Sequence, residues 1–158
     1  MQKKNLLSII AIIFITFLTF SGCKKNIIFY KFEKIPPKNW DKNNFIIFKP
    51  TINDTISVVN ISILIRHNNS YPNQNLFLFV KTISPLGFYV KDTVLINLAD
   101  DKGKWYGKGF ANIWTHEILY KKNVKFPFQG IYTFQIEQAM RNNPLPGIVN
   151  IGIKISKN

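Results

Sequence analysis

The chain has 158 residues, a single cysteine and a formal net charge of +13. One cysteine excludes an intrachain disulfide framework, and a domain of this length buries an adequate core without disulfides or metal ions. The basic charge comes almost entirely from lysines scattered singly along the chain, a distribution typical of a solvated outer face and not of a nucleic-acid-binding surface.

Residues 1–22 have the three parts of a secretory signal, which are a positive start, an apolar stretch and small residues at the end. Lys3 and Lys4 supply the positive start, and the apolar stretch covers residues 6–20. This stretch is short for a transmembrane helix, which needs roughly 20 apolar residues. We therefore expect a signal peptide that is removed.

Residues 20–23 are Phe-Ser-Gly-Cys and resemble the lipobox of bacterial lipoproteins. Small residues at Ser21 and Gly22 let a peptidase approach the backbone beside a lipidated thiol, although Phe20 stands where an aliphatic residue is usual. We expect cleavage between Gly22 and Cys23, with the Cys23 sulfur carrying a diacylglycerol. Two alternatives stay open, a stray thiol near an ordinary secretory cleavage site and a retained apolar anchor.

After cleavage, residues 23–41 are expected to form a lipidated tether, and residues 42–158 a single folded domain. In the tether, lysines alternate with aromatic residues, and Pro36-Pro37 stiffens its end. No acidic pair follows Cys23, which favours an anchor facing the periplasm. We expect a lipid-anchored protein of the cell membrane or the outer membrane, in a compartment without accessible nucleic acid.

From residue 42 onward, apolar residues recur with a period close to two, which predicts half-buried strands. Residues 76–83 are almost continuously apolar and predict a central strand covered on both faces. Residues 113–120 fit a short helix or a bent strand. About eight strands with little helix predict an all-β fold, an antiparallel β-sandwich of jelly-roll type. The other expected strands cover residues 45–48, 55–66, 88–98, 124–128, 131–140 and 149–156.

The sequence offers little for catalysis. His67 and His116 lie far apart in the chain, and neither has a second ligand-type residue at metal spacing. The sequence has no nucleophile elbow, phosphate-binding loop or zinc-protease motif, and its only thiol is assigned to lipid. We predict no enzyme activity, no catalytic residue, no metal and no cofactor. A hydrolase would need two carboxylates facing each other across a cleft, from Asp100, Asp101, Glu117 and Glu137.

Aromatic residues in or beside loops are candidates for a binding surface, because they stack on sugar rings or anchor protein partners. Each of them can instead cap the core. Arg66 and Arg141 each end an expected strand, and the planar fork of arginine suits a fixed ion pair or carboxylate contact. The loop aromatics leave open a periplasmic carbohydrate- or peptidoglycan-binding module. These aromatic candidates are Tyr71, Trp105, Tyr106, Trp114 and Tyr120.

Four blocks of the sequence resemble the GldH family of gliding-motility lipoproteins. The most specific is Glu-Gln-Ala-Met-Arg at 137–141, which ends the longer block Phe-Pro-x-x-Gly-x-Tyr-x-Phe-x-Ile-Glu-Gln-Ala-Met-Arg at 126–141. The others are Arg-x-Asn-Asn-x-Tyr-Pro-x-x-Asn-Leu-Phe-Leu at 66–78, Gly-Lys-Trp-x-Gly-x-Gly at 103–109, and Leu-x-Gly-Ile at 145–148 before Ile-Gly at 151–152.

The resemblance implies a membrane lipoprotein that is needed for gliding over surfaces and for type IX protein secretion, with no assigned enzyme activity. Cys23 matches the lipidated position. Among the matched residues, Glu137 and Arg141 are polar and are the least easily explained by fold, so both join the expected binding surface. The partners implied are membrane lipid through the acylated cysteine and other gliding or secretion proteins. The expected role is that of a non-catalytic scaffold component.

Overall fold

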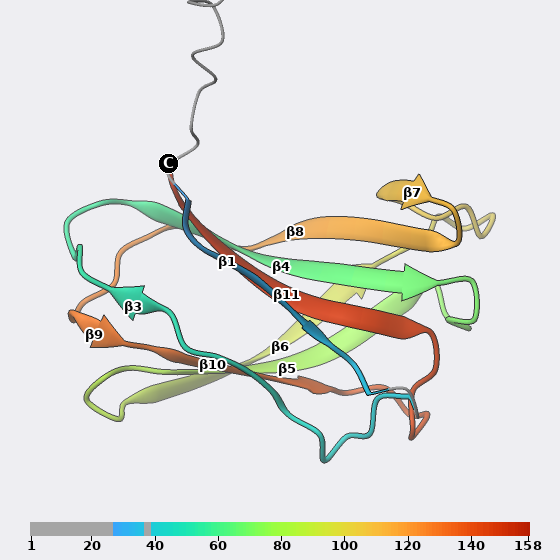
Figure 1. The fold of residues 1–158 in the computed structure, drawn as a ribbon, viewed down its shortest axis with the longest axis horizontal. Coiled ribbons are helices and arrows are strands. Elements are labelled where there is room, and N and C mark those ends of the chain that lie inside the picture. The colour runs from blue at the N-terminus through green and yellow to red at the C-terminus, as the bar shows by residue number, and fades with distance from the viewer. Residues whose placement is uncertain (1–26, 37–38) are drawn as a thin grey trace, which may run out of the picture.

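The computed structural model describes residues 27–36 and 39–158, which form an all-β fold of antiparallel sheets packed face to face (Figure 1). The expected signal peptide, its cleavage site and Cys23 lie outside the described residues. Among the residues described, none forms a helix long and apolar enough to cross a membrane.

The larger sheet has five strands in the order β1-β11-β4-β8-β7. Its inner face is built from alternate residues of β4 and β11, including Ile63 and Ile153, which pair with each other and are fully buried. Alternation of this kind gives one face to the core and the other to solvent. The strands are β1 (Ile27–Lys34), β4 (Val59–Asn68), β7 (Lys108–Phe110), β8 (Ile113–Val124) and β11 (Ile148–Lys157).

The facing sheet has four strands in the order β2-β10-β5-β6, and a separate two-stranded ladder joins β3 to β9. Phe134 and Ile136 of β10 are fully buried and meet the large sheet across the core. The strands are β2 (Ile46–Phe48), β3 (Thr51–Ile52), β5 (Asn75–Ile83), β6 (Tyr89–Asn97), β9 (Gly130–Ile131) and β10 (Thr133–Gln138).

Much of the expected tether is folded, which corrects the predicted domain boundary at residue 42. Strand β1 pairs antiparallel with β11, from Ile27 opposite Ser156 to Lys34 opposite Asn150. Trp40 is fully buried and exchanges backbone hydrogen bonds with Leu145, both 2.9 Å long. Lysine alternating with aromatic residues is the pattern of an edge strand with one solvated face. Residues 24–26 alone separate the expected lipidation site from the sheet.

Other elements differ from prediction in detail. Residues 113–120 are extended, and β8 continues to Val124, so the separate strand expected at 124–128 is absent from this described segment. Strand β5 is central, as expected, but only its inner face is fully buried, through Leu76, Leu78 and Val80. Coverage of both faces was therefore a wrong prediction. Strands β3, β7 and β9 have two or three residues each, too few for alternation to reveal them.

Candidate functional site

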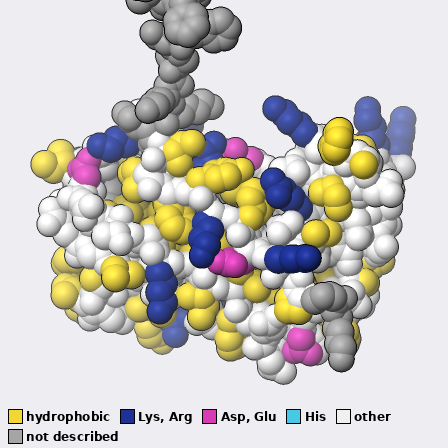
Figure 2. Space-filling view, viewed as in Figure 1, with side chains coloured by type: hydrophobic (Ala, Val, Ile, Leu, Met, Phe, Trp, Pro, Cys, Tyr) yellow, Lys and Arg dark blue, Asp and Glu magenta, His cyan; other side chains and the backbone are white. Residues whose placement is uncertain are grey.

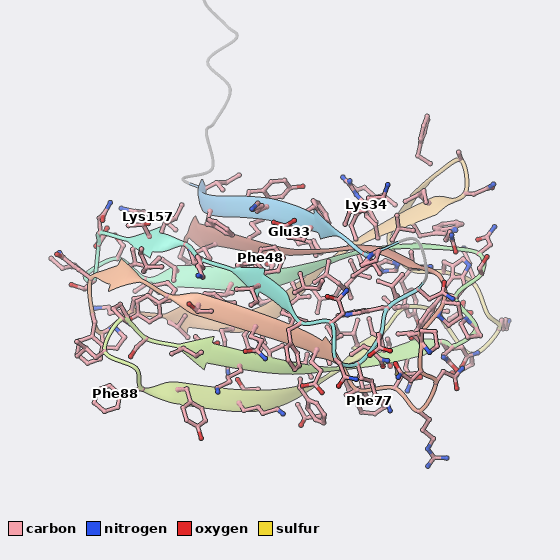
Figure 3. All side chains as sticks on the ribbon, turned by 60° about the horizontal axis from the view of Figure 1, so that its bottom comes forward. Glu33, Lys34, Phe48, Phe77, Phe88 and Lys157 are labelled. Carbon is pink, nitrogen blue, oxygen red and sulfur yellow. The ribbon has the colours of Figure 1, made fainter. Side chains whose placement is uncertain are left out.

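The strand register gives the sandwich two ends, which we call the N-terminal end and the distal end. The N-terminal end holds the start of β1, where Ile27 pairs with Ser156. It also holds the connections 84–88 and 125–129 and the segment 49–58, which includes β3. Hydrogen bonds tie these connections together, such as that from Gln129 Nε2 to the Asn53 carbonyl (3.0 Å). The distal end holds the connections 69–74, 98–107 and 139–147. Figure 3 shows Phe88 and Lys157 at the N-terminal end, with Lys34 and Phe77 toward the other.

At the distal end, the two histidines lie together in the core, although they are far apart in the chain. Ile65 of β4 pairs with His116 of β8, which makes His67 the diagonal neighbour of His116. Both side chains are buried, and their Nε2 atoms are 3.0 Å apart. His67 Nδ1 lies 3.2 Å from the Asn68 carbonyl and can donate to it. His67 Nε2 then accepts a hydrogen bond from the Nε2–H of His116, an arrangement that suits two neutral rings.

Burial lowers the pKa of both histidines, and burial together with the nearby charge of His67 lowers the pKa of His116 to about 4. Both rings are therefore uncharged at neutral pH. A general base works best with a pKa near the operating pH, so this pair suits a structural role. Among the described residues, no group of three or more His, Cys, Asp or Glu side chains could hold a metal ion.

Two of the expected binding aromatics pack on this histidine pair. The ring centroids of Trp105 and Tyr71 lie 4.4 Å and 5.8 Å from that of His67. Tyr71 is buried and donates its hydroxyl hydrogen to the Asn75 carbonyl at 2.6 Å. Gly147 packs so closely that an added Cβ would lie 2.2 Å from the Tyr71 nitrogen. Tyr71 and Trp105 thus help to hold the distal end together, the core-capping alternative considered for them.

Trp114 and Arg66 lie near the distal end on opposite faces of the large sheet, because Trp114 pairs with inward-facing His67 and Arg66 is the residue before His67 in β4. Trp114 is half-buried, and its Nε1–H donates to Asn69 Oδ1 at 3.1 Å. The Arg66 guanidinium carbon lies 4.1 Å from the centre of the Phe32 ring, a cation–π contact with β1. The salt bridges among the described residues are all made by lysines. Stacking on Phe32 therefore replaces the ion pair expected for Arg66.

Apart from the consecutive Asp100 and Asp101, the carboxylates considered for a hydrolase occupy separate places. Asp100 accepts backbone hydrogen bonds from Lys102 and Lys104 and closes its own turn. Glu117 pairs with Lys154 at 2.6 Å, and Glu137 lies 3.8 Å from Lys91. The fourth, Asp101, lines a surface groove. These contacts do not bring two of the four carboxylates face to face.

Two grooves open at the distal end, and each includes an exposed candidate. The first has a volume of about 490 Å³ and contains Tyr106 and Asp101 among amide side chains. The second has a volume of about 480 Å³ and contains Arg141 beside Met140. Asn73 lines both grooves, so they adjoin. Amides, an arginine and an aromatic ring make this a polar surface with an apolar element.

The N-terminal end is apolar by comparison. A groove of about 260 Å³ lies beside the turn between β5 and β6, and most of its lining is aromatic or aliphatic. The Phe88 and Phe128 rings stack there with centroids 6.3 Å apart. None of the residues that line this groove is among the site residues expected from the sequence. The available signal was an apolar residue placed in a turn, at Leu86 and Phe88 around Gly87.

Comparisons with known proteins agree over most of the chain. A family model described as GldH lipoprotein matches residues 27–155. The gliding motility lipoprotein GldH homolog of Christiangramia forsetii is 34% identical over 149 residues, covering 90% of this chain and 91% of the relative. The gliding motility lipoprotein GldH of Flavobacterium johnsoniae is 32% identical over 143 residues, covering 86% and 88%.

Among solved structures, the crystal structure of the infectious bursal disease virus VP2 subviral particle aligns with a TM-score of 0.35 at 12% identity. The alignment covers 85% of this chain and 31% of the viral chain. A TM-score this low does not establish a shared fold.

Proposed function

The chain belongs to the GldH lipoprotein family of gliding-motility lipoproteins, and on that premise we propose that it is a non-catalytic scaffold component associated with type IX secretion. Acyl chains on Cys23 would hold it to the membrane, facing the periplasm. A diacylglycerol with a further N-acyl chain suffices for this, because stable anchoring takes about two lipid chains.

The observation that carries this proposal is the pair of adjoining grooves at the distal end. Strand β1 begins at the opposite end of the sandwich, four residues after Cys23 in the chain. A partner protein bound at the grooves would therefore meet the end farthest from the anchor. Exposed Tyr106 and Arg141 are of the residue types that most often dominate the energy of protein interfaces.

Site-specific photo-crosslinking in gliding cells tests this proposal. A crosslinking amino acid replaces Tyr106, and the matched control replaces Tyr30 on the outer edge of β1. The two side chains are similarly exposed, at 49% and 54%. We expect crosslinks to gliding or secretion proteins from position 106 and few from position 30. Equal yields at the two positions, or none at position 106 in a chain that restores colony spreading, would contradict the proposal.

A second candidate function, glycan binding, is favoured by the composition of the first groove. Exposed Tyr106 stands beside Asp101 and the amides of Asn73, Gln74 and Asn97. An aromatic face with neighbouring amides suits a sugar ring, which offers an apolar face and a rim of hydroxyls. Retention on peptidoglycan that is lost in Tyr106→Ala and kept in Tyr30→Ala would support this function. Equal retention of the two variants would exclude a role for the groove.

A further inference from the structure

The N-terminal end carries large apolar side chains on its surface, which we call the apolar rim. Ile56 is 81% exposed and Phe88 is 67% exposed, and their neighbours at this end are more than half exposed. Isolated exposed apolar residues are common, but a cluster marks an interaction site. The rim consists of Ile56, Leu86, Phe88, Tyr89 and Ile131.

The rim residues come from three separate parts of the chain that meet at this end. Ile56 follows Asp54, whose carboxylate is 2.7 Å from Lys157 at the end of β11. Ile131 belongs to β9, whose ladder with β3 closes the same end. Leu86 and Phe88 belong to the turn between β5 and β6. In Figure 2, hydrophobic side chains stand out at several places along the left margin, which is the N-terminal end in the view shared with Figure 1.

The covalent chain limits how far this end can be from the lipid. Cys23 and Ile27 are four residues apart, and four residues span at most about 14 Å in any conformation. Strand β11 has ten residues, which corresponds to a length of about 33 Å. The distance from the lipid attachment point to Ile27 is thus less than half the length of the sandwich. Ile27 is itself at the N-terminal end, beside Ser156.

Charge at this end is complementary to an anionic membrane surface. Lys49, Lys122 and Lys125 are exposed on the connections and strand ends that reach it. The nearby carboxylate of Asp54 is already paired with Lys157. Lysines are attracted to acidic lipid head groups, and tyrosine at the edge of an apolar surface suits the head-group region.

We propose that the apolar rim inserts into the head-group region of the bilayer that holds acylated Cys23. The sandwich then stands on its N-terminal end, and the distal grooves point away from the membrane. The occupant of the apolar groove at Phe88 and Phe128 is lipid. This inference rests on the acylated anchor of the proposed function and adds an orientation to it.

A spin label placed at single positions tests the orientation. The Cys23 sulfur is used by the lipid, so Phe88→Cys introduces the only free thiol of the acylated full chain. Phe110→Cys is the matched control, because Phe110 is 87% exposed and lies in β7 at the distal end. The proteins are reconstituted in vesicles of phosphatidylethanolamine and phosphatidylglycerol. We expect the label at position 88 to collide mainly with oxygen, which is lipid-soluble, and the label at position 110 mainly with a water-soluble nickel chelate.

Equal access of the nickel chelate to both positions would overturn the orientation. Shielding of position 88 in cells but not in vesicles would also overturn it, because a protein would then be the occupant. Flotation separates these results from failure of the anchor. The acylated anchor would be refuted if the full chain did not float with the vesicles, or if its Cys23→Ser variant floated equally well. If the acylated chain floats but the label at position 88 is in water, only the orientation would be refuted.

Discussion

The two ends of this sandwich differ in how their aromatic residues are packed. At the distal end, Tyr71 and Trp105 pack against buried His67, and the exposed ring of Tyr106 stands among amides in a polar groove. At the N-terminal end, Phe88 and Tyr89 are largely exposed around an apolar groove. Aromatic content therefore does not mark a binding site by itself. What distinguishes the two ends is whether the fold supplies partners for the rings.

The tightest packing of the distal end can be broken at Gly147. This residue has φ +81, and a Cβ there would meet the Tyr71 backbone. Gly147→Ala should lower the free energy of unfolding by about 3 kcal/mol or more, from strain together with overpacking. Gly103→Ala is the matched control, with φ +79 but open space around it, and it should cost about 1 kcal/mol. Equal losses in urea unfolding would show that the contact with Tyr71 is unimportant.

The histidine pair makes the stability of the distal end depend on pH. Unfolded histidine takes up a proton near its usual pKa of 6.5, whereas buried His116 does so only near 4. Acid therefore favours the unfolded chain, and the free energy of unfolding should fall by roughly 2 kcal/mol between pH 6.5 and 4.5. The carboxylates with lowered pKa, Asp54 and Asp92, contribute constant stability there, because their unfolded pKa is about 3.8.

The control for this pH dependence is His116→Asn. We expect it to be less stable at every pH but to have a flatter profile between pH 6.5 and 4.5. A variant with the same slope as the parent chain would mean that the histidine pair is not the source of the acid sensitivity.

A smaller effect separates the buried tyrosine of the distal end from its exposed one. Tyr71→Phe removes the hydrogen bond to the Asn75 carbonyl and should cost about 1 kcal/mol in unfolding free energy. Tyr106→Phe removes a hydroxyl from an exposed ring and should leave the unfolding free energy unchanged. If both variants matched the parent chain in chemical denaturation, the Tyr71 hydroxyl would not support the fold.

The smallest stability effect is expected at the N-terminal end. Phe88 is mostly exposed, so Phe88→Ser should change the free energy of unfolding in solution by less than about 0.5 kcal/mol. A loss above about 1 kcal/mol in thermal or urea unfolding would show that Phe88 belongs to the core, and the two ends would then be less different than described.

The all-β architecture was predictable because alternation is strong in the long strands, as in β11. Strand β1 was missed because lysine alternating with aromatic residues also fits a chain lying along a membrane, and sequence alone does not reveal that β11 needs an edge partner. His67 continues the inward parity of Ile61, Ile63 and Ile65, which was a usable signal. Its contact with His116 follows only from the register of β4 against β8.

The candidate site was predictable only in part. Arg141 and Tyr106 do line grooves at the distal end, whereas Tyr71 and Trp105 are held in its core. Loop position suggested the three aromatic residues equally, because the sequence does not show which ring finds a pocket in its own fold, whereas Arg141 was suggested by its place at the end of an expected strand. The apolar rim depends on three separate parts of the chain meeting at one end, which is a property of the topology.

The pairing of β1 with β11 has a mechanical consequence for a protein anchored at its N-terminus. A pull between the lipid and a partner at the distal end would act along the axis of β1, which runs from one end of the sandwich to the other. All of its registered contacts with β11, from Ile27 to Lys34, would then share the load in shear. Peeling would break them one at a time, so this arrangement suits a tether that has to withstand traction.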